Sequence, residues 1–372
     1  MINLETSKSI STETCIQAQE PTKKTASHLP AIDGLRGLAA MMVVFYHCWN
    51  MHRSVPFPQF SLFGVTVPLY RVFTPGYTGV YLFFVLSGFC LAYPFFSNPE
   101  RKDNWPAYAM NRVRRIWPPY VISFLIPYAI GALLQYAQIY PAEEFLYEKF
   151  KWIKFVKALF LIRKSHICNS YWTLVLEWRW YLCFPALLIM ARRIPPVFMV
   201  AAVCGVSYLS QYPFLAGRLQ PFALGPLFGF LPMFALGIWA AHLAVSKSEA
   251  LPLWERWLVN HSLLGVTVSA LWCLAFCPPV KQITYTTTLA AWGPLYFFLI
   301  LAVLNQPQFK QVFSSAPFVK LGVISYSIYL LQEPVICAGR IFIEMPGSGG
   351  FGLFCTRYLL MPVLCVLAGW AF

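Results

Sequence analysis

Charged residues are scarce in this 372-residue chain. Lys, Arg, Asp and Glu together make up 11% of it, whereas apolar residues make up 58%. A soluble domain carries about 25% charged residues, and a chain with so few cannot cover a surface that faces water. This scarcity excludes an ordinary soluble enzyme.

The chain also lacks short segments in which apolar and polar residues alternate, which excludes a porin-type barrel. Its apolar residues form long runs instead, and a helix needs about 20 such residues to span a membrane. The sequence therefore predicts an all-α, polytopic membrane helix bundle of about ten transmembrane helices. The predicted spans are 33–52, 76–97, 117–138, 171–191, 196–214, 221–245, 261–279, 284–304, 319–343 and 352–372.

The polar N-terminal segment has no apolar core of the kind found in a signal peptide. Residues 1–30 are predicted to be a disordered cytosolic tail, followed by a transmembrane domain over 31–372. A cytosolic N-terminus places most basic residues on the inside, as the positive-inside rule favours, although the basic segment 139–170 conflicts with it. Two stretches are too polar to span. The stretch 103–116 is expected along the membrane interface, and 145–163 as an amphipathic surface helix or a partly re-entrant element.

Besides the lipid bilayer, the sequence indicates neither a nucleic-acid partner nor a metal, because it lacks a basic patch and a cluster of cysteines. The net charge is +14, but the basic residues are spread over separate loops, so no nucleic-acid partner is expected. The eleven cysteines lie mostly in apolar runs, and only Cys273 and Cys277 are close in sequence. We expect neither a disulfide framework nor a metal site.

Ionisable residues inside a span are costly and indicate function. The first span contains Arg36 and His47, which are eleven residues apart and hence on one helical face, about 16 Å apart along the axis. With Asp33 as the expected cap of the helix start, Arg36 lies at the cytosolic surface and His47 near mid-membrane. The alternatives are that Arg36 only anchors lipid phosphates and that His47 is a buried imidazole bonded to another helix.

Glu177 lies six residues into another span, and a lone carboxylate there needs a partner. Arg179 would face away from it on a helix, so His47 or Arg36 on another helix is the expected partner. Tyr181 follows Glu177 by four residues, on the same face, and can donate a hydrogen bond. A purely structural ion pair is the alternative.

Two further segments combine small or basic residues with a membrane location. Ser87 and Gly88 lie in mid-span, where they either permit close helix contact or clear space for a ligand that Ser87 binds. Arg112 and Arg115 share a helical face just before a Pro-Pro pair that is expected to break the helix. They either follow the positive-inside rule or form a phosphate clamp, since guanidinium groups match phosphate oxygens.

Five stretches in this order resemble the acyltransferase 3 family of integral membrane O-acyltransferases over residues 30–372. They are AIDGLRGLAAMMVVFYH at 31–47, FFVLSGF at 83–89, RVRRIWPPY at 112–120, WTLVLEWRWYLCFP at 172–185 and LGVISYSIYLLQEP at 321–334. Gln332 stands where the family often has His, so we assign it no proton-transfer role. The chain ends in an apolar run at Phe372, which leads us to expect a truncated C-terminus, and we expect no fused SGNH-type esterase domain.

The resemblance implies an acyl-CoA donor, with acetyl as the default group, and a hydroxyl of an extracytoplasmic carbohydrate or glycan as acceptor. The expected catalytic residues are His47, Arg36 and Glu177. His47 would act as general base or acyl carrier, and Glu177 would orient it or bind the acceptor. Arg36, Arg112 and Arg115 would bind the donor phosphates, and Ser87 and Tyr181 the substrate. The expected location is the inner membrane of a bacterium. The alternatives are a transporter, or an acyltransferase for a lipid or small molecule.

Overall fold

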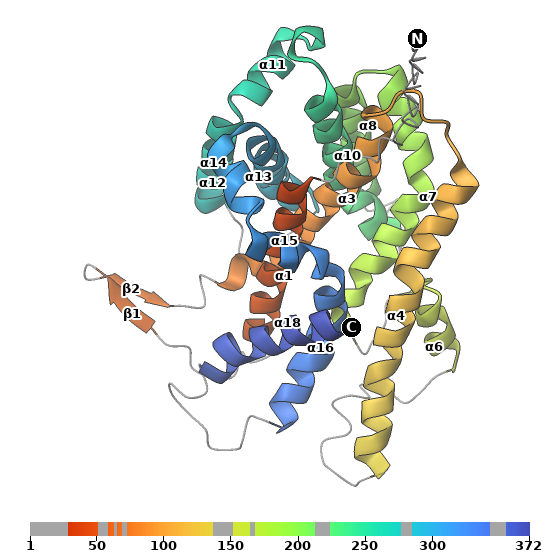
Figure 1. Ribbon diagram of the computed structural model, residues 1–372, viewed down its shortest axis with the longest axis vertical. Helices are drawn as coiled ribbons and strands as arrows, with labels where there is room; N and C mark the ends of the chain where they lie inside the picture. The colour runs from red at the N-terminus through yellow and green to blue at the C-terminus, as the bar shows by residue number, and fades with distance from the viewer. Residues whose placement is uncertain are drawn as a thin grey trace, which may run out of the picture.

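The structure is a computed structural model that describes residues 29–50, 59–62, 65–68, 73–136, 152–163, 168–212, 224–276, 285–342 and 355–372. The described part is a bundle of helices with one small hairpin at its side (Figure 1). The tail predicted over 1–30 lies, up to residue 28, outside the described residues.

The helices follow the predicted spans closely along the chain. Their bounds are α1 Pro30–Asn50, η1 Thr74–Thr78, α3 Gly79–Phe96, α4 Trp105–Tyr136, α6 Trp152–Leu159, η2 Asn169–Tyr171, α7 Trp172–Arg193, α8 Pro196–Ser210, α10 Leu224–Val245, η4 Ser248–Ala250, α11 Leu253–Asn260, α12 Ser262–Phe276, α13 Tyr285–Asn305, α14 Pro307–Phe313, α15 Ala316–Val323, α16 Ser325–Phe342, η6 Thr356–Leu360 and α18 Met361–Ala371. Each of the predicted spans overlaps at least one of these helices.

Fewer helices than predicted are long and apolar enough to cross a membrane unaided. Among the described residues there are 4, or up to 6 if each of two bent helix pairs counts as one span. One bent pair is α11 with α12, and the other is α15 with α16, where the axis turns by 70°. Helices such as α8 have 15 residues and reach only about 22 Å. The structure thus supports an apolar helix bundle typical of an integral membrane protein, without fixing ten spans.

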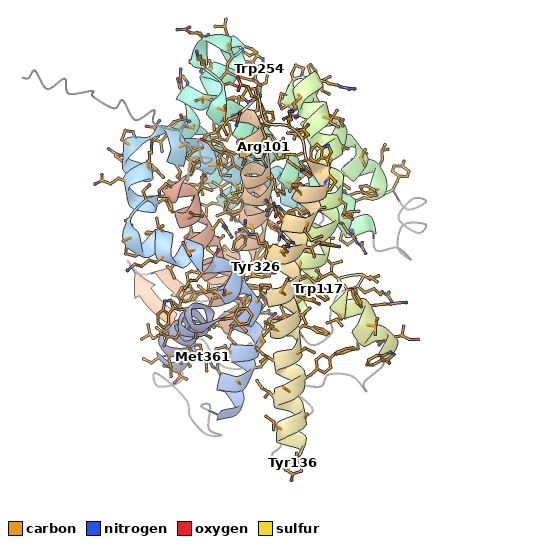
Figure 2. All side chains as sticks on the ribbon, turned by 45° about the vertical axis from the view of Figure 1, so that its right-hand side comes forward. Arg101, Trp117, Tyr136, Trp254, Tyr326 and Met361 are labelled. Carbon is orange, nitrogen blue, oxygen red and sulfur yellow. The ribbon has the colours of Figure 1, made fainter. Side chains whose placement is uncertain are left out.

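Helix α4 corrects one expectation from the sequence. Pro118-Pro119 was expected to break the helix, but α4 runs without interruption through Pro118, Pro119 and Pro127. It is the long helix that reaches Tyr136 at the far end of the molecule from Arg101 (Figure 2). An interior proline costs about 3 kcal/mol. Packing offsets this cost, because Tyr120 and Phe124 are fully buried and the Tyr326 hydroxyl donates to the carbonyl of Ile116.

Helix α1 begins at Pro30, three residues before the expected cap. Proline is favoured in the first helical turn because it has no N–H to leave unpaired there. Asp33 is therefore inside the first turn, where a negative charge suits the helix dipole, and its carboxylate lies 3.7 Å from the Arg36 guanidinium.

Glycines let the central helices touch backbone to backbone. A Cβ added at Gly88 would lie 2.0 Å from the Phe234 carbonyl oxygen, and one added at Gly237 would lie 1.9 Å from that of Val85. This close α3–α10 contact supports the packing interpretation of Gly88 and contradicts the idea that it clears space for a ligand. The main core surrounds this contact, and a smaller cluster joins α1, α16 and α18.

Two elements outside the long helices frame the bundle. Strands β1 (Gln59–Leu62) and β2 (Val65–Pro68) pair antiparallel, with Leu62 opposite Val65. Sequence analysis missed this hairpin, although Val-Thr-Val after a two-residue connection is a β signal. Helix α6 falls inside the predicted surface helix 145–163 and packs on α4 through Phe155.

Candidate active site

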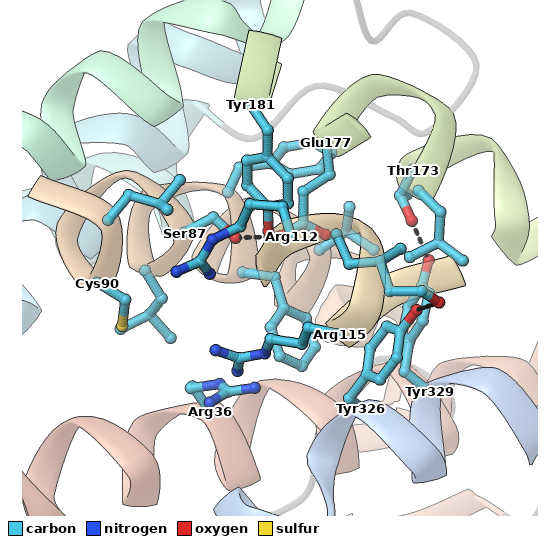
Figure 3. A pocket seen from close by; sticks show the side chains of 17 residues that line it. Arg36, Ser87, Cys90, Arg112, Arg115, Thr173, Glu177, Tyr181, Tyr326 and Tyr329 are labelled. Carbon is cyan, nitrogen blue, oxygen red and sulfur yellow. Dashed lines mark hydrogen bonds between the residues drawn. The ribbon is translucent and has the colours of Figure 1, made fainter. Parts of the chain in front are cut away.

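A cavity of about 220 Å³ opens between α1, α3, α4, α7 and α16. It is smaller than the roughly 300–1,000 Å³ of pockets for drug-sized ligands. The side chains that line it are Arg36, Val80, Phe83, Phe84, Leu86, Ser87, Cys90, Leu91, Arg112, Arg115, Ile116, Thr173, Leu174, Glu177, Tyr181, Tyr326 and Tyr329 (Figure 3).

Helix α3 gives the cavity its length. Most of its lining residues recur at three- and four-residue intervals from Val80 to Leu91, which places them on one helical face. Eleven residues of helix correspond to about 16 Å. The cavity therefore runs along α3, with Val80 and Phe83 towards one end, Ser87 in the middle and Cys90 and Leu91 towards the other.

Three arginines gather at the Cys90 end. Figure 3 shows the guanidinium groups of Arg36 and Arg115 beside each other, with that of Arg112 above them. Arg112 is also held by aromatic faces, because its guanidinium carbon lies 5.6 Å from the centre of the Tyr108 ring and 5.9 Å from that of Tyr181. Three cations from two helices, α1 and α4, line one small space, which makes this end suited to a polyanion.

Glu177 lies at the middle of the cavity, opposite Ser87. The Ser87 hydroxyl donates to Glu177 Oε1 at 2.5 Å, and the Tyr181 hydroxyl donates to the same oxygen. The expected partnership of Glu177 with His47 or Arg36 is therefore wrong, because two hydroxyl groups bind one oxygen of the carboxylate instead. The hydrogen bond from Tyr181, one helical turn away, was predicted from the sequence, whereas the one from Ser87 on α3 was not.

A hydrogen-bonded path leaves the inner end of the cavity. The Thr173 and Tyr329 hydroxyls are 2.5 Å apart, and Tyr329 also donates to the Ser170 carbonyl at 2.7 Å. The backbone N–H and the hydroxyl of Ser170 both donate to Glu333 Oε2 at 2.9 Å. Glu333, which belongs to α16, is thus held by η2, the short helix just before α7.

His47 lies at the end of this path. Its Nδ1 is 3.6 Å from Glu333 Oε1, and both side chains are buried, with 8% and 4% of their surface exposed. A carboxylate facing Nδ1 favours the tautomer with the proton on Nδ1, which leaves the Nε2 lone pair available as a base. Such contacts often tighten only when substrate binds.

The structure brings six of the seven predicted site residues together and leaves one aside. Arg36, Ser87, Arg112, Arg115, Glu177 and Tyr181 all line the cavity, whereas His47 does not. The uninterrupted helix α1 keeps Arg36 and His47 on the predicted face, and it is the path through Tyr329 that relates His47 to the cavity.

Sequence analysis missed Glu333, the partner of His47. The signal was present, because Glu333 is an ionisable residue within the predicted span 319–343, the same criterion that identified Glu177. Tyr329 and Ser170 carried no comparable signal, since tyrosine and serine are ordinary residues in membrane helices.

Gln332, next to Glu333, is fully buried, and neither end of its amide has a hydrogen-bond partner. It lies four residues from both Ile328 and Ile336, which pack on Val44 and Cys48 of α1. Gln332 therefore faces the small α1–α16–α18 cluster, a different direction from Glu333. Within the described ranges, no disulfide joins two cysteines and no three His, Cys, Asp or Glu side chains gather as a metal site requires.

An apolar helix bundle that holds a cation-rich cavity and a buried His–Glu pair is typical of an integral membrane enzyme. The sequence profile of the acyltransferase 3 family, described as an acyltransferase domain, matches residues 29–370. The chain therefore belongs to this family and is an enzyme that transfers acyl groups.

Several curated proteins are similar along most of this chain. A putative acetyltransferase, ORF330, of Acidianus two-tailed virus is 28% identical over 82% of this chain and 84% of its own length. The acyltransferase MdmB of Streptomyces mycarofaciens is 25% identical over 84% of this chain and 80% of its own. The peptidoglycan O-acetyltransferase OatA of Listeria monocytogenes is 24% identical over 85% of this chain but 50% of its own length.

Proposed function

We propose that this enzyme transfers an acyl group, in the simplest case acetyl, from acyl-CoA to a hydroxyl of an extracytoplasmic carbohydrate or glycan. The observation that carries the proposal is a cavity with three arginines at one end and Thr173 and Tyr329 at the other, from which hydrogen bonds through Ser170 lead to Glu333, the carboxylate that faces His47. Relatives named as acetyltransferases support acetyl as the group, and OatA is a precedent for a glycan acceptor.

The donor is oriented by charge and size. CoA carries several phosphate charges at one end of a long arm, and its thioester is at the other. Arg36, Arg112 and Arg115 would hold the phosphates at one end of the cavity, which places the thioester towards Thr173 and Tyr329. A volume of about 220 Å³ suits the arm and not the bulky nucleotide, which would remain outside.

This arrangement implies how the protein lies in the membrane. Acyl-CoA is a cytosolic metabolite, so the cavity end with the arginines, and with it the start of α1, would face the cytosol. His47 is eleven residues further along α1, about 16 Å deeper. The acceptor hydroxyl would then reach His47 from the opposite side, and the acyl group would cross between the two.

The chemistry follows from the His47–Glu333 pair. The acceptor oxygen attacks the thioester carbonyl carbon while Nε2 of His47 takes the hydroxyl proton. The C–S bond of the resulting tetrahedral intermediate breaks, and the departing sulfur receives the proton from His47. Glu333 stabilises the transient imidazolium. In the acyl-relay version, His47 Nε2 attacks the thioester carbon first, the C–S bond breaks and CoA leaves as the thiolate. The acceptor oxygen then attacks the acyl carbon, the bond to Nε2 breaks, and the hydroxyl proton of the acceptor passes to the CoA thiolate.

The test is an acetyl-transfer assay with purified protein in detergent and acetyl-CoA carrying a labelled acetyl group. Candidate acceptors are a glycan panel, phospholipids and small polyols, and the products are separated and counted. We expect labelled O-acetyl glycan together with an equal amount of CoA. If the label appears in a lipid or a small molecule instead, the proposed glycan acceptor is wrong and that molecule is the acceptor. No transfer to any acceptor, without release of CoA, would contradict the proposed donor.

A further inference from the structure

Glu177 has a feature that the transfer reaction itself does not use. Both of its protein partners, the hydroxyls of Ser87 and Tyr181, donate to Oε1. No described residue donates to Oε2, and no arginine of the cavity forms an ion pair with the carboxylate. Oε2 is also not among the atoms that the protein encloses without a partner, so it is accessible and its hydrogen-bonding capacity remains available to a ligand that enters the cavity.

The position of Glu177 along the cavity is equally specific. It lies four residues, about 6 Å of helix, from Thr173 at the inner end, and level with Ser87 in the middle of the α3 face. The arginines lie beyond it at the other end. His47 already has Glu333 as its carboxylate partner, so Glu177 is not needed to orient the imidazole.

We propose that Glu177 is a donor-binding residue whose Oε2 accepts a hydrogen bond from an amide N–H in the arm of acyl-CoA. This inference rests on the proposed function. The arm contains two amide groups, and both lie between the phosphates and the thioester. With phosphates at the arginines and the thioester near Thr173, an amide N–H must pass the middle of the cavity. A carboxylate fixed by two hydroxyls, with its second oxygen open, is a suited acceptor for it.

Ser87 and Tyr181 are positioning residues in this scheme. By occupying Oε1 they fix the rotation of the carboxyl group, so that Oε2 points into the cavity. The ring of Tyr181 also lies under Arg112, at 5.9 Å from the guanidinium carbon. Tyr181 therefore contacts both Arg112, at the phosphate end of the donor site, and Glu177, at its amide end.

The experiment measures the Kd of CoA and of two analogues by calorimetry on the purified protein in detergent. In each analogue, one amide N–H of the arm is replaced by an ester oxygen, which keeps the shape and removes the donor. For the wild-type protein, one ester analogue should bind at least about tenfold more weakly than CoA, the usual effect of losing a hydrogen bond to a charged group. For Glu177→Gln this ratio should fall to about twofold or less.

Ser87→Ala tests the positioning role, because it removes one of the two bonds to Oε1 and keeps Oε2 and the bond from Tyr181. Its preference for CoA over the same ester analogue should lie between those of wild type and Glu177→Gln. Thermal unfolding of each variant shows whether it is folded when its Kd is measured. Equal ratios in wild type and Glu177→Gln would overturn this inference while leaving the proposed donor intact. Failure of the wild type to bind CoA at all would overturn both.

Discussion

The cavity and the His47 pair are both polar regions inside an apolar bundle, yet they are built in opposite ways. The cavity is open, lined by three arginines against one carboxylate, and its charges face empty space between helices. The His47–Glu333 pair is enclosed, with one cationic group at most and a carboxylate fixed by Ser170. An excess of like charge is tolerated where a ligand of opposite charge enters, and a closed pair is suited to moving one proton.

From this difference we expect the cavity to bind the donor and the His47–Glu333 pair to catalyse the transfer. Substitutions in the cavity should weaken donor binding, and substitutions around His47 should slow transfer once the donor is bound. Substitutions of His47, Glu333 and the cavity arginines test this division, and a substitution of Gly88 tests the helix contact next to the cavity. Each has a matched control elsewhere in the chain.

The largest effect is expected for His47→Ala. Loss of a general base typically costs about 10²–10⁴-fold, so kcat should fall by this factor while KM for acetyl-CoA stays close to wild type. His242→Ala, on α10 beside Phe96 and away from the cavity, is the control and should retain activity. An unchanged kcat in the His47 variant would rule out the chemistry proposed above. Mass spectrometry under single-turnover conditions would detect an acyl-His47 if the relay version operates.

Glu333→Gln should lower kcat by roughly 10²-fold, because an amide cannot stabilise the imidazolium that forms on His47. The double variant with His47→Ala should be no slower than His47→Ala alone, since both residues act in one step. Glu255→Gln is the control, because this carboxylate is as buried, at 3% exposed, but bonds Trp239 at 3.0 Å on another helix pair. Additive losses in the double variant would show that Glu333 acts independently of His47.

Arg36→Ala and Arg115→Ala should act on binding. Each is expected to raise KM for acetyl-CoA by about 10–100-fold, the range for a lost charge-assisted hydrogen bond, with kcat little changed. Neither should affect transfer from acetyl-pantetheine, which has the arm but no nucleotide phosphates. Arg114→Ala, next in sequence but absent from the cavity lining, should leave both donors unaffected. If the variants lose activity equally with acetyl-CoA and acetyl-pantetheine, the arginines do not bind the donor phosphates.

Gly88 follows Ser87 on α3, but Ser87 lines the cavity whereas Gly88 lies against α10. Gly88→Ala places a methyl group 2.0 Å from the Phe234 carbonyl, and such overpacking costs about 1–3 kcal/mol. Its unfolding temperature in detergent should therefore drop. Gly205→Ala, where nothing lies within 4 Å of the added methyl group, should not lower that temperature. A stable Gly88→Ala protein would show that α3 and α10 can separate without cost.

Much of the fold was predictable because apolar run length directly reflects the thickness of a membrane. All the predicted spans contain helices. The number of helices that cross the membrane could not be predicted, since the bend between α15 and α16 leaves no trace in hydropathy. The continuity of α4 through two prolines was also hidden, because it depends on aromatic packing against α6 and on Tyr326.

The candidate site divides in the same manner. Charged residues inside apolar runs drew attention to Arg36, His47 and Glu177, because burying a charge is costly enough to be informative by itself. The partners of these three residues on other helices could not be predicted from the sequence. Whether Glu177 meets an imidazole or two hydroxyls depends on which helices are neighbours, and that is a property of the packed bundle.

The sequence by itself determined that this protein is a membrane acyltransferase of helical architecture, with an arginine and a histidine spaced on one face of its first helix. Those properties are local, set by composition, by helical periodicity and by motifs within single segments. Only the tertiary structure decided that His47 faces Glu333, that Glu177 lines the cavity with one oxygen open, and that hydrogen bonds of Thr173, Tyr329 and Ser170 connect the cavity with Glu333. Contacts such as Ser170–Glu333, 163 residues apart, and Ile116–Tyr326, 210 residues apart, arise from helix packing, which no single segment encodes.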